Sequence, residues 1–259
     1  MDLALDDKVV FVTGASGGIG QALVEAFLAE GARVGASSRR GVDAPPGAGE
    51  RVASILADAR RPAELAAAMR EVEARWGRVD VCVANAGVWP PEDLPLDVLP
   101  EERVRAVIET NLLGAAWTAQ AFLASLRRTG PRGDGHGASL IFIGSTAGRF
   151  GERGHAEYAA SKAGLRGLAL SLKNEIVAID PGARVNLVEP GWTATPMAQA
   201  ALEAEGLIEA STRTMPLRRV AAPGDVAAAV LFFASPAMSR HVTGEALLVA
   251  GGMEGRVLW

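Results

Sequence analysis

Short apolar runs alternate with longer stretches of helical periodicity along almost the whole chain, and this alternation constrains the fold more than any other feature. The first run, at residues 8–12, is rich in β-branched side chains and stops at Thr13 and Gly14. After it, Leu23 and Phe27 recur at the spacing of one helix face. The same pattern predicts further strands at 33–37, 52–57, 79–84, 139–143, 184–188 and 246–249, and further helices at 62–76, 101–126, 157–179 and 226–234.

Strands that alternate with helices form βαβ units, in which a parallel sheet is covered on both faces. We therefore expect an α/β fold: a doubly wound parallel β-sheet of about seven strands with helices on both faces, the Rossmann fold. The sequence has no internal repeat and no long linker, so we expect a single domain over 1–259, with a lid-like segment at about 192–217. Ligands of such sheets bind beyond the carboxyl ends of the strands, which directs attention to the turns that follow them.

The turn after the first strand is rich in glycine. Gly14, Gly18 and Gly20 allow a tight turn and a close approach of the backbone to a pyrophosphate, and the following helix offers free N–H groups to that anion. A glycine-rich turn can be purely structural, but this position between a strand and an amphipathic helix favours dinucleotide binding. The turn is not a P-loop, because no Gly-Lys-Ser/Thr sequence follows it.

The second expected strand ends in two serines and two arginines. A site that prefers NAD places a carboxylate here for the ribose 2′-hydroxyl, whereas the 2′-phosphate of NADP needs cationic and hydroxyl donors. No acidic residue occurs before Asp43, so Ser38 and Arg39 favour NADP(H) over NAD(H). The alternative is that Arg39 and Arg40 are a solvated surface pair.

The next two turns also carry polar residues. Asp58 can accept a hydrogen bond from an adenine amino group, with Ala59 offering its backbone, or it can cap the helix that begins at Pro62. The following turn would bring its backbone close to the adenosine ribose and tie neighbouring strands together through an amide; it consists of Asn85, Ala86 and Gly87.

Tyr158 and Lys162 are four residues apart, which places them one turn apart on one face of a helix. A phenol ionises near pH ~10 and is a poor base at neutral pH. An ammonium about 4 Å away favours the phenolate by roughly 4 kcal/mol at an effective dielectric of about 20, or about three pKa units. Most Tyr–Lys pairs at this spacing are ordinary exposed residues, but Tyr158 is the only tyrosine here and is a candidate general acid or base.

Two further polar residues accompany this pair. Asn111 lies within an apolar helical stretch, where an amide is costly unless it is hydrogen-bonded, so a buried structural role is its simplest interpretation. Ser145 follows the fifth strand at its carboxyl end, where a hydroxyl can polarise a carbonyl or merely form the turn.

Composition excludes several classes of protein. A net charge of −4 argues against a nucleic-acid partner or an anionic membrane surface. The single cysteine, Cys82, excludes an internal disulfide, and with three scattered histidines it offers no usual metal-ligand spacing. The acidic N-terminus is unlike a signal peptide, and the longest apolar runs are too short to cross a bilayer, so we expect a cytoplasmic enzyme.

In this order and spacing, the motifs resemble those of the short-chain dehydrogenase/reductase family, in its single-domain NAD(P)-dependent branch. Within that family the chain is similar to 3-oxoacyl-(acyl-carrier-protein) reductases and related ketone reductases. The resemblance runs nearly end to end. It is carried by residues 13–20, the Asn85-Ala86-Gly87 turn, Asn111, Ser145, Tyr158, Lys162, and residues 190–195, 242–245 and 251–252.

The resemblance implies a role for each matching residue. Tyr158 would exchange a proton with the substrate oxygen, and Lys162 would favour its ionised form and hold the nicotinamide ribose. Ser145 would hydrogen-bond the substrate oxygen, and Asn111 would support a water that links Lys162 to solvent. Further cofactor contacts are implied for Ser16, Ile19, Pro190, Gly191, Thr193 (by its backbone) and Thr195.

Three positions depart from the family pattern. Ala84 stands where a second asparagine usually precedes the fourth turn, and Thr193 stands where an aliphatic residue is common. Many reductases of the family carry a basic residue inside the glycine turn, where this chain has Ser16 and Gly17. The preference for NADP(H) therefore depends on Arg39, alone or together with Arg40.

The implied function is an NADP(H)-dependent oxidoreductase that interconverts a ketone and a secondary alcohol by hydride transfer. The alternatives are an NAD-dependent alcohol dehydrogenase, a non-catalytic NADP-binding sensor, and an epimerase or dehydratase on the same fold. The partner would be a small carbonyl or alcohol substrate, and the long helices predict a homotetramer or homodimer, with an apolar chain end at 257–259. An apolar substrate pocket is expected from Trp89, Phe150, Trp192 and Met197, while Glu152 and His155 are expected at the surface.

Overall fold

The computed structural model describes residues 2–203 and 206–253. At its centre is a seven-stranded, fully parallel sheet with the strand order β3-β2-β1-β4-β5-β6-β7. The strands are β1 (Val9–Thr13), β2 (Arg33–Ser38), β3 (Val52–Leu56), β4 (Val81–Ala84), β5 (Ser139–Ile143), β6 (Arg184–Pro190) and β7 (Ala246–Val249). The predicted doubly wound α/β fold is confirmed.

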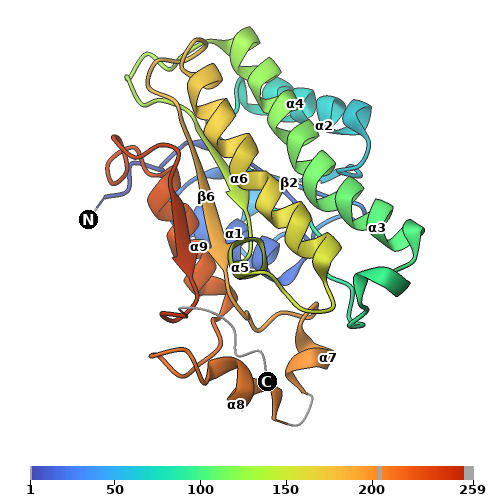
Figure 1. The fold of residues 1–259 in the computed structure, drawn as a ribbon. Helices are drawn as coiled ribbons and strands as arrows, with labels where there is room; N and C mark the ends of the chain where they lie inside the picture. Colours follow the sequence, from blue (N-terminus) through green and yellow to red (C-terminus); the bar gives the residue numbers. More distant parts are fainter. Residues whose placement is uncertain (1, 204–205, 254–259) are drawn as a thin grey trace.

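Helices cover both faces of this sheet (Figure 1). On one face lie α2 (Pro62–Trp76), α4 (Gly114–Thr129) and α6 (Ala156–Ile176), and on the other lie α1 (Gly18–Ala29) and α9 (Pro223–Ala234). Alternate residues of β1 serve the two faces: Phe11 lies in the core with α2, whereas Val12 lies in the core with α1. Both faces are therefore buried, which is why the strands are continuous apolar runs.

The remaining elements are short and lie at the ends of the strands. They are the 3₁₀ turns η1 (Gly49–Arg51) and η2 (Leu96–Val98), α3 (Glu101–Ile108), α5 (Thr146–Phe150), α7 (Gln199–Leu202) and α8 (Leu207–Thr212). Figure 1 shows α7 and α8, in orange, beyond one edge of the sheet, at the bottom of the view. The segment expected to act as a lid thus contains two short helices.

The predicted long helix at 101–126 is interrupted. A π-helical turn, η3 (Glu109–Leu113), separates α3 from α4. Within it, Asn111 is fully buried and forms hydrogen bonds with both backbone groups of Val88: its Oδ1 accepts from the N–H at 2.7 Å and its Nδ2 donates to the carbonyl at 2.9 Å. Such turns often occur at functional sites, and here the turn anchors the segment that follows β4.

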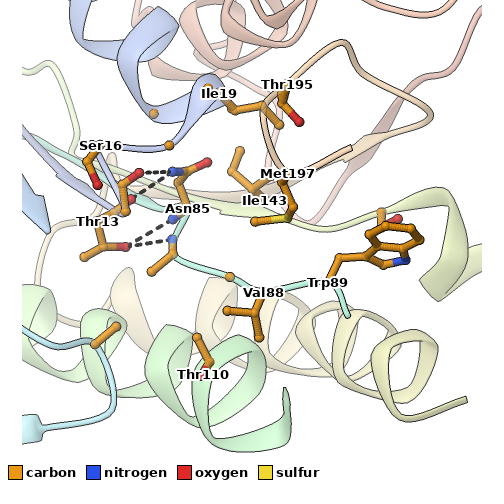
Figure 2. A pocket seen from close by; sticks show the side chains of 18 of the residues that line it. Thr13, Ser16, Ile19, Asn85, Val88, Trp89, Thr110, Ile143, Thr195 and Met197 are labelled. Carbon is orange, nitrogen blue, oxygen red and sulfur yellow. Dashed lines mark hydrogen bonds between the residues drawn. The ribbon is translucent and has the colours of Figure 1, made fainter. Parts of the chain in front are cut away.

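The strand order reverses direction at β1, since the chain proceeds from β1 to β2 on one side and later returns to β4 on the other. This is the switch point at which doubly wound sheets bind ligands. Asn85 fastens the two strand ends together, because its Nδ2 donates to the carbonyls of Thr13 and Gly14 at 2.9 and 3.1 Å (Figure 2). The predicted tie between neighbouring strands is therefore present.

Within the described ranges, no helix combines the length and apolar character needed to cross a membrane. The apolar chain end predicted at 257–259 lies outside the described residues.

Candidate active site

A cavity of about 510 Å³ opens beyond the carboxyl ends of β1 to β6. Figure 2 shows Thr13 and Ser16 at one end of it and Trp89 at the other, with Ile143 and Met197 between. Every site residue predicted from the sequence lines this cavity except Asn111. The residues are Gly14, Ser16, Gly18, Ile19, Gly20, Ser38, Arg39, Asp58, Ala59, Asn85, Ala86, Gly87, Ser145, Tyr158, Lys162, Pro190, Gly191, Thr193 and Thr195.

The glycine turn is closed so tightly that side chains are excluded. Gly14 has a φ of +65°, and a Cβ there would lie 2.7 Å from the Cα of Ala86. A Cβ on Gly20 would lie 2.2 Å from the carbonyl oxygen of Gly14. Helix α1 begins at Gly18 without a side-chain cap, so its first N–H groups face the cavity end of the turn. This is a cradle for an anionic group.

The ends of β2 and β3 bring three arginines to the same end of the cavity: Arg39, Arg40 and Arg60. Arg39 and Arg40 are exposed. Ser38 is buried, and its hydroxyl donates to the carbonyl of Gly41 at 2.9 Å.

Asp58 does not cap α2, so that alternative is wrong. The N-cap of α2 is Arg61, and it forms no side-chain cap. The carboxylate of Asp58 instead binds the guanidinium of Arg60, whose Nε donates to both carboxylate oxygens at 3.0 Å. These hydrogen bonds hold the pKa of Asp58 at about 2, well below its usual value, so the carboxylate stays ionised at neutral pH.

Tyr158 and Lys162 both lie on α6 and line the cavity, as the sequence predicts. The ammonium of Lys162 lies 5.8 Å from the centre of the Tyr158 ring and donates to the carbonyl of Ile143 at 2.9 Å. Its side chain is buried, and burial lowers its pKa from 10.5 to about 8. A Cβ on Gly87 would lie 3.2 Å from this ammonium and 3.3 Å from Oδ1 of Asn111, so glycine keeps that space open.

Ser145 is the N-cap of α5, and its Oγ accepts from the N–H of Ala147 at 3.1 Å. Ser145 also lines the cavity, as Tyr158 does, so its hydroxyl fills both roles that the sequence left as alternatives: it forms the turn, and it is accessible from the cavity. Beyond β6, Thr193 is buried and its hydroxyl donates to the carbonyl of Gly191 at 3.0 Å, so its backbone N–H is the donor left for a ligand. Thr195 is half-buried and lines the cavity.

Asn111 is buried behind the cavity. Besides its two bonds to Val88, its Nδ2 donates to the hydroxyl of Ser161 at 3.1 Å. The structure thus satisfies the requirement that a buried amide be hydrogen-bonded.

Comparison with known proteins agrees with this geometry. A family model described as enoyl-(acyl carrier protein) reductase matches residues 14–254. An uncharacterised short-chain type dehydrogenase/reductase of Sinorhizobium fredii is 36% identical over 255 residues, which cover 95% of this chain and 43% of that relative. The 3-oxoacyl-(acyl-carrier-protein) reductase FabG of Escherichia coli is 34% identical over 253 residues, covering 96% of this chain and 98% of the relative. The chain belongs to the short-chain dehydrogenase/reductase family.

A solved structure supports the same placement at the level of the fold. A short-chain dehydrogenase/reductase from Brucella melitensis, described as a glucose/ribitol dehydrogenase, has a TM-score of 0.85 and 28% identity, covering 98% of this chain and 99% of that chain. Membership of the family makes this chain an NAD(P)-dependent oxidoreductase. The glycine turn fits such a dinucleotide, because a Cβ on Gly14 would collide with Ala86 and one on Gly20 with the carbonyl of Gly14, so only glycine allows the tight turn that presents backbone to a pyrophosphate.

The substrate end of this dehydrogenase/reductase site differs from expectation at three residues. Glu152, expected at the surface, lines the cavity, and its side chain is only 9% exposed. Trp89, Trp192 and Met197 line the cavity as predicted, whereas Phe150 does not and is 36% exposed. His155, expected at the surface, is only 1% exposed, so that prediction is wrong. Its ring stacks on Trp89, with the ring centres 4.9 Å apart and the planes at 20°.

The burial of His155 has a simple cause that sequence reasoning missed. The residue precedes α6 directly, and the segment after β4 folds over it, so its Nε2 lies 2.8 Å from the carbonyl oxygen of Pro90. The available signal was its position three residues before Tyr158, one helical turn from the candidate general acid or base.

Proposed function

We propose that this enzyme reduces a ketone to a secondary alcohol with NADP(H), and catalyses the reverse reaction, with Tyr158 as the general acid or base. One observation carries the proposal: Tyr158, Lys162 with its buried ammonium, and Ser145 line the same cavity. The glycine turn lines the other end of that cavity. The 34% identical relative from Escherichia coli, named as a 3-oxoacyl-(acyl-carrier-protein) reductase, supports a ketone as the substrate.

A nicotinamide cofactor supplies the hydride when it is bound. The chain's own residues manage the proton and the substrate oxygen. The phenol of Tyr158 gives its proton to the developing alkoxide in reduction and takes it back in oxidation. The ammonium of Lys162 favours the phenolate through charge attraction, which is strong because Lys162 is buried.

Two further residues would assist this proton transfer. The Oγ of Ser145 accepts a backbone hydrogen bond, which leaves its O–H proton for the substrate oxygen and orients the carbonyl towards Tyr158. Asn111 positions the backbone of Val88 and would hold a water that connects Lys162 with solvent.

The preference for NADP(H) is proposed from the residues beyond β2. Arg39 and Arg40 line the cavity and are exposed, so either guanidinium can approach a 2′-phosphate without losing a buried partner. The carboxylate that an NAD site uses is missing at this turn, because the first acid after β2 is Asp43. Use of NAD(H) is the alternative.

We also propose a single functional domain over 1–259, a cytoplasmic location and a homotetramer, or a homodimer in its place. Apolar side chains remain exposed on and next to the helices of the α4–α6 face: Leu113 at the end of η3 at 39%, Leu170 on α6 at 42%, and Val177 directly after α6 at 40%. Pairing of these helices between subunits would remove that apolar surface from water.

The deciding experiment measures NADPH consumption with a panel of ketones by wild type and by Tyr158→Phe. Turnover should fall by roughly 10²- to 10⁴-fold in the variant, while its NADPH affinity stays close to that of wild type. Retained turnover would refute the assigned acid. Tight NADPH binding without oxidation by any ketone would favour a sensor, and a changed substrate without net NADPH use would favour an epimerase or dehydratase.

A further inference from the structure

Trp89 forms a wall at the substrate end of the cavity. It lies beside Val88 and faces the side of the cavity that carries Ile143 and Met197 (Figure 2). Its ring meets that of Trp192 nearly at a right angle, with the ring centres 5.8 Å apart and the planes at 80°. Two indoles in this arrangement form a corner, in which a third flat ring can stack on one indole and meet the edge of the other.

The back of this wall is fixed by His155. The imidazole stacks on Trp89, and because a carbonyl oxygen can only accept, the Nε2 atom donates its proton to Pro90. His155 is buried and does not belong to the cavity lining, whereas Trp89 does, so the imidazole contacts the tryptophan from outside the cavity. Its other ring nitrogen, Nδ1, lies 3.3 Å from a carboxylate oxygen of Asp93, whose side chain is 77% exposed.

The rest of the segment that carries Trp89 is also fastened. Asn111 binds both backbone groups of Val88. Arg103 donates to the carbonyl of Glu92 at 2.7 Å and forms an ion pair of 2.8 Å with the buried Glu157. The wall is thus held in place before a substrate arrives, which reduces the entropy lost on binding.

Charge divides the two ends of the cavity. Three arginines lie beyond β2 and β3, at the end near the glycine turn. Among the described residues that line the cavity beyond β4, β5 and β6, Lys162 is the single cation, and its ammonium is buried. Glu152 adds a carboxylate to this end, and one of its oxygens lies 3.9 Å from Nδ1 of His155. An anionic substrate would find repulsion here and no accessible positive partner.

We propose that the substrate is a neutral ketone with a flat aromatic group next to its carbonyl, recognised by Trp89 and Trp192, and that His155 is the positioning residue that holds Trp89 in place. The inference rests on the proposed ketone reduction and adds the class of ketone. It predicts that the enzyme selects ketones by shape and by charge. A ketone with a flat ring should have a higher kcat/KM than one with a flexible chain of equal size, and a neutral ring a higher kcat/KM than a negatively charged ring.

The experiment compares acetophenone with 2-octanone, two methyl ketones of equal carbon number, and with 4-acetylbenzoate, the charged analogue of acetophenone. In wild type, kcat/KM for acetophenone should exceed that for each of the others by about tenfold. In Glu152→Gln, 4-acetylbenzoate should recover part of that deficit. Equal values for acetophenone and 2-octanone in wild type would overturn the assigned substrate class, and 4-acetylbenzoate as good as acetophenone would overturn the charge argument.

Three variants test the role of the wall. Trp89→Leu should remove most of the preference for acetophenone over 2-octanone. His155→Phe keeps a ring for stacking but loses the donor to Pro90, and should raise KM for acetophenone several-fold with a smaller change in kcat. Asp93→Asn is the matched control, because it changes the exposed partner of His155 but not the bond to Pro90. If kcat/KM for both ketones falls alike in Trp89→Leu and His155→Phe, or if Asp93→Asn matches His155→Phe, the positioning role is wrong.

A binding measurement separates this inference from the proposed function. Calorimetric titration of acetophenone into the protein with NADP⁺ reports the aromatic corner without any turnover. Binding that is lost in Trp89→Leu supports the corner even if no ketone is reduced, in which case only the proposed reaction has failed. Absence of acetophenone binding to wild type overturns the aromatic substrate class.

Discussion

Replacement of Lys162 by methionine should change the pH dependence of stability in a way that the structure determines. In the folded protein without ligands, burial lowers the pKa of Lys162 from 10.5 to about 8. At about 1.36 kcal/mol for each pKa unit, this difference means that the buried ammonium destabilises the folded state by about 3 kcal/mol. Methionine has a similar length and carries no charge, so it removes this destabilisation.

The sign follows from the two pKa values. Below pH 8 the lysine is protonated in both the folded and the unfolded state, so the full destabilisation is present. Between about pH 8 and 10.5 the folded protein releases the proton that the unfolded chain still holds, and the free energy of unfolding of wild type rises with pH. Lys162→Met lacks this rise.

At pH 7 the variant should therefore be more stable than wild type by about 2 kcal/mol, since loss of the hydrogen bond to Ile143 offsets about 1 kcal/mol of the gain. The advantage should shrink steadily as the pH approaches 10. Cys82, whose thiol pKa is raised by burial, is present in both proteins, so its titration cancels in the difference.

Urea unfolding at pH 7, 8, 9 and 10, at one fixed protein concentration, measures this difference when both lysine and methionine forms carry Tyr158→Phe, because the phenol that Lys162 influences then does not titrate. Lys173→Met, at another lysine of α6, serves as the reference for placing methionine on this helix. A difference between wild type and Lys162→Met that stays constant from pH 7 to 10 would refute the reasoning. So would a variant less stable than wild type at pH 7.

Three other changes test the cofactor end and the assembly. Arg39→Ala should weaken NADPH binding by about 10- to 100-fold, the value of a lost charged hydrogen bond, and NADH binding far less; equal losses by titration would mean that Arg39 does not bind the 2′-phosphate. Gly20→Ala should destabilise the protein by about 1–3 kcal/mol or more and abolish NADPH binding, because its Cβ would lie 2.2 Å from the carbonyl oxygen of Gly14. Gly17→Ala is the control: its Cβ would lie 3.4 Å from the same oxygen, so this variant should melt close to wild type. Size-exclusion chromatography with light scattering should show a tetramer or dimer at micromolar concentration, and a monomer would contradict the predicted subunit contacts.

Most of the fold could be predicted because its signals are local. The buried strands are β-branched runs, and α2 begins at Pro62 and ends at Trp76, as the sequence predicts. The π-helical turn at Glu109–Leu113 could not be predicted in this way, because it depends on a long-range contact. Asn111 forms its hydrogen bonds with Val88, which lies 23 residues earlier in the chain.

The cofactor end of the site can be predicted from the sequence more fully than the substrate end, because one is formed by backbone groups and the other by side chains. The cofactor end is built from backbone: glycines without Cβ atoms, free N–H groups at the start of α1, and strand ends whose positions the sheet determines. A motif of residue types is enough to predict such a surface. The substrate end is built from side chains on connecting segments, and their directions depend on contacts between distant parts of the chain.

His155 and Trp89 show the consequence. A histidine followed by charged and small residues is typical of an exposed position, and nothing local indicates that the segment after β4 will cover it. Only the folded chain brings the carbonyl of Pro90 to the imidazole, 65 residues apart in sequence, and so turns an apparent surface residue into the support of an aromatic wall. If Trp89 contacts the substrate as proposed, such pairings allow two dehydrogenase/reductases with the same Tyr–Lys motif to share a cofactor and still select different ketones.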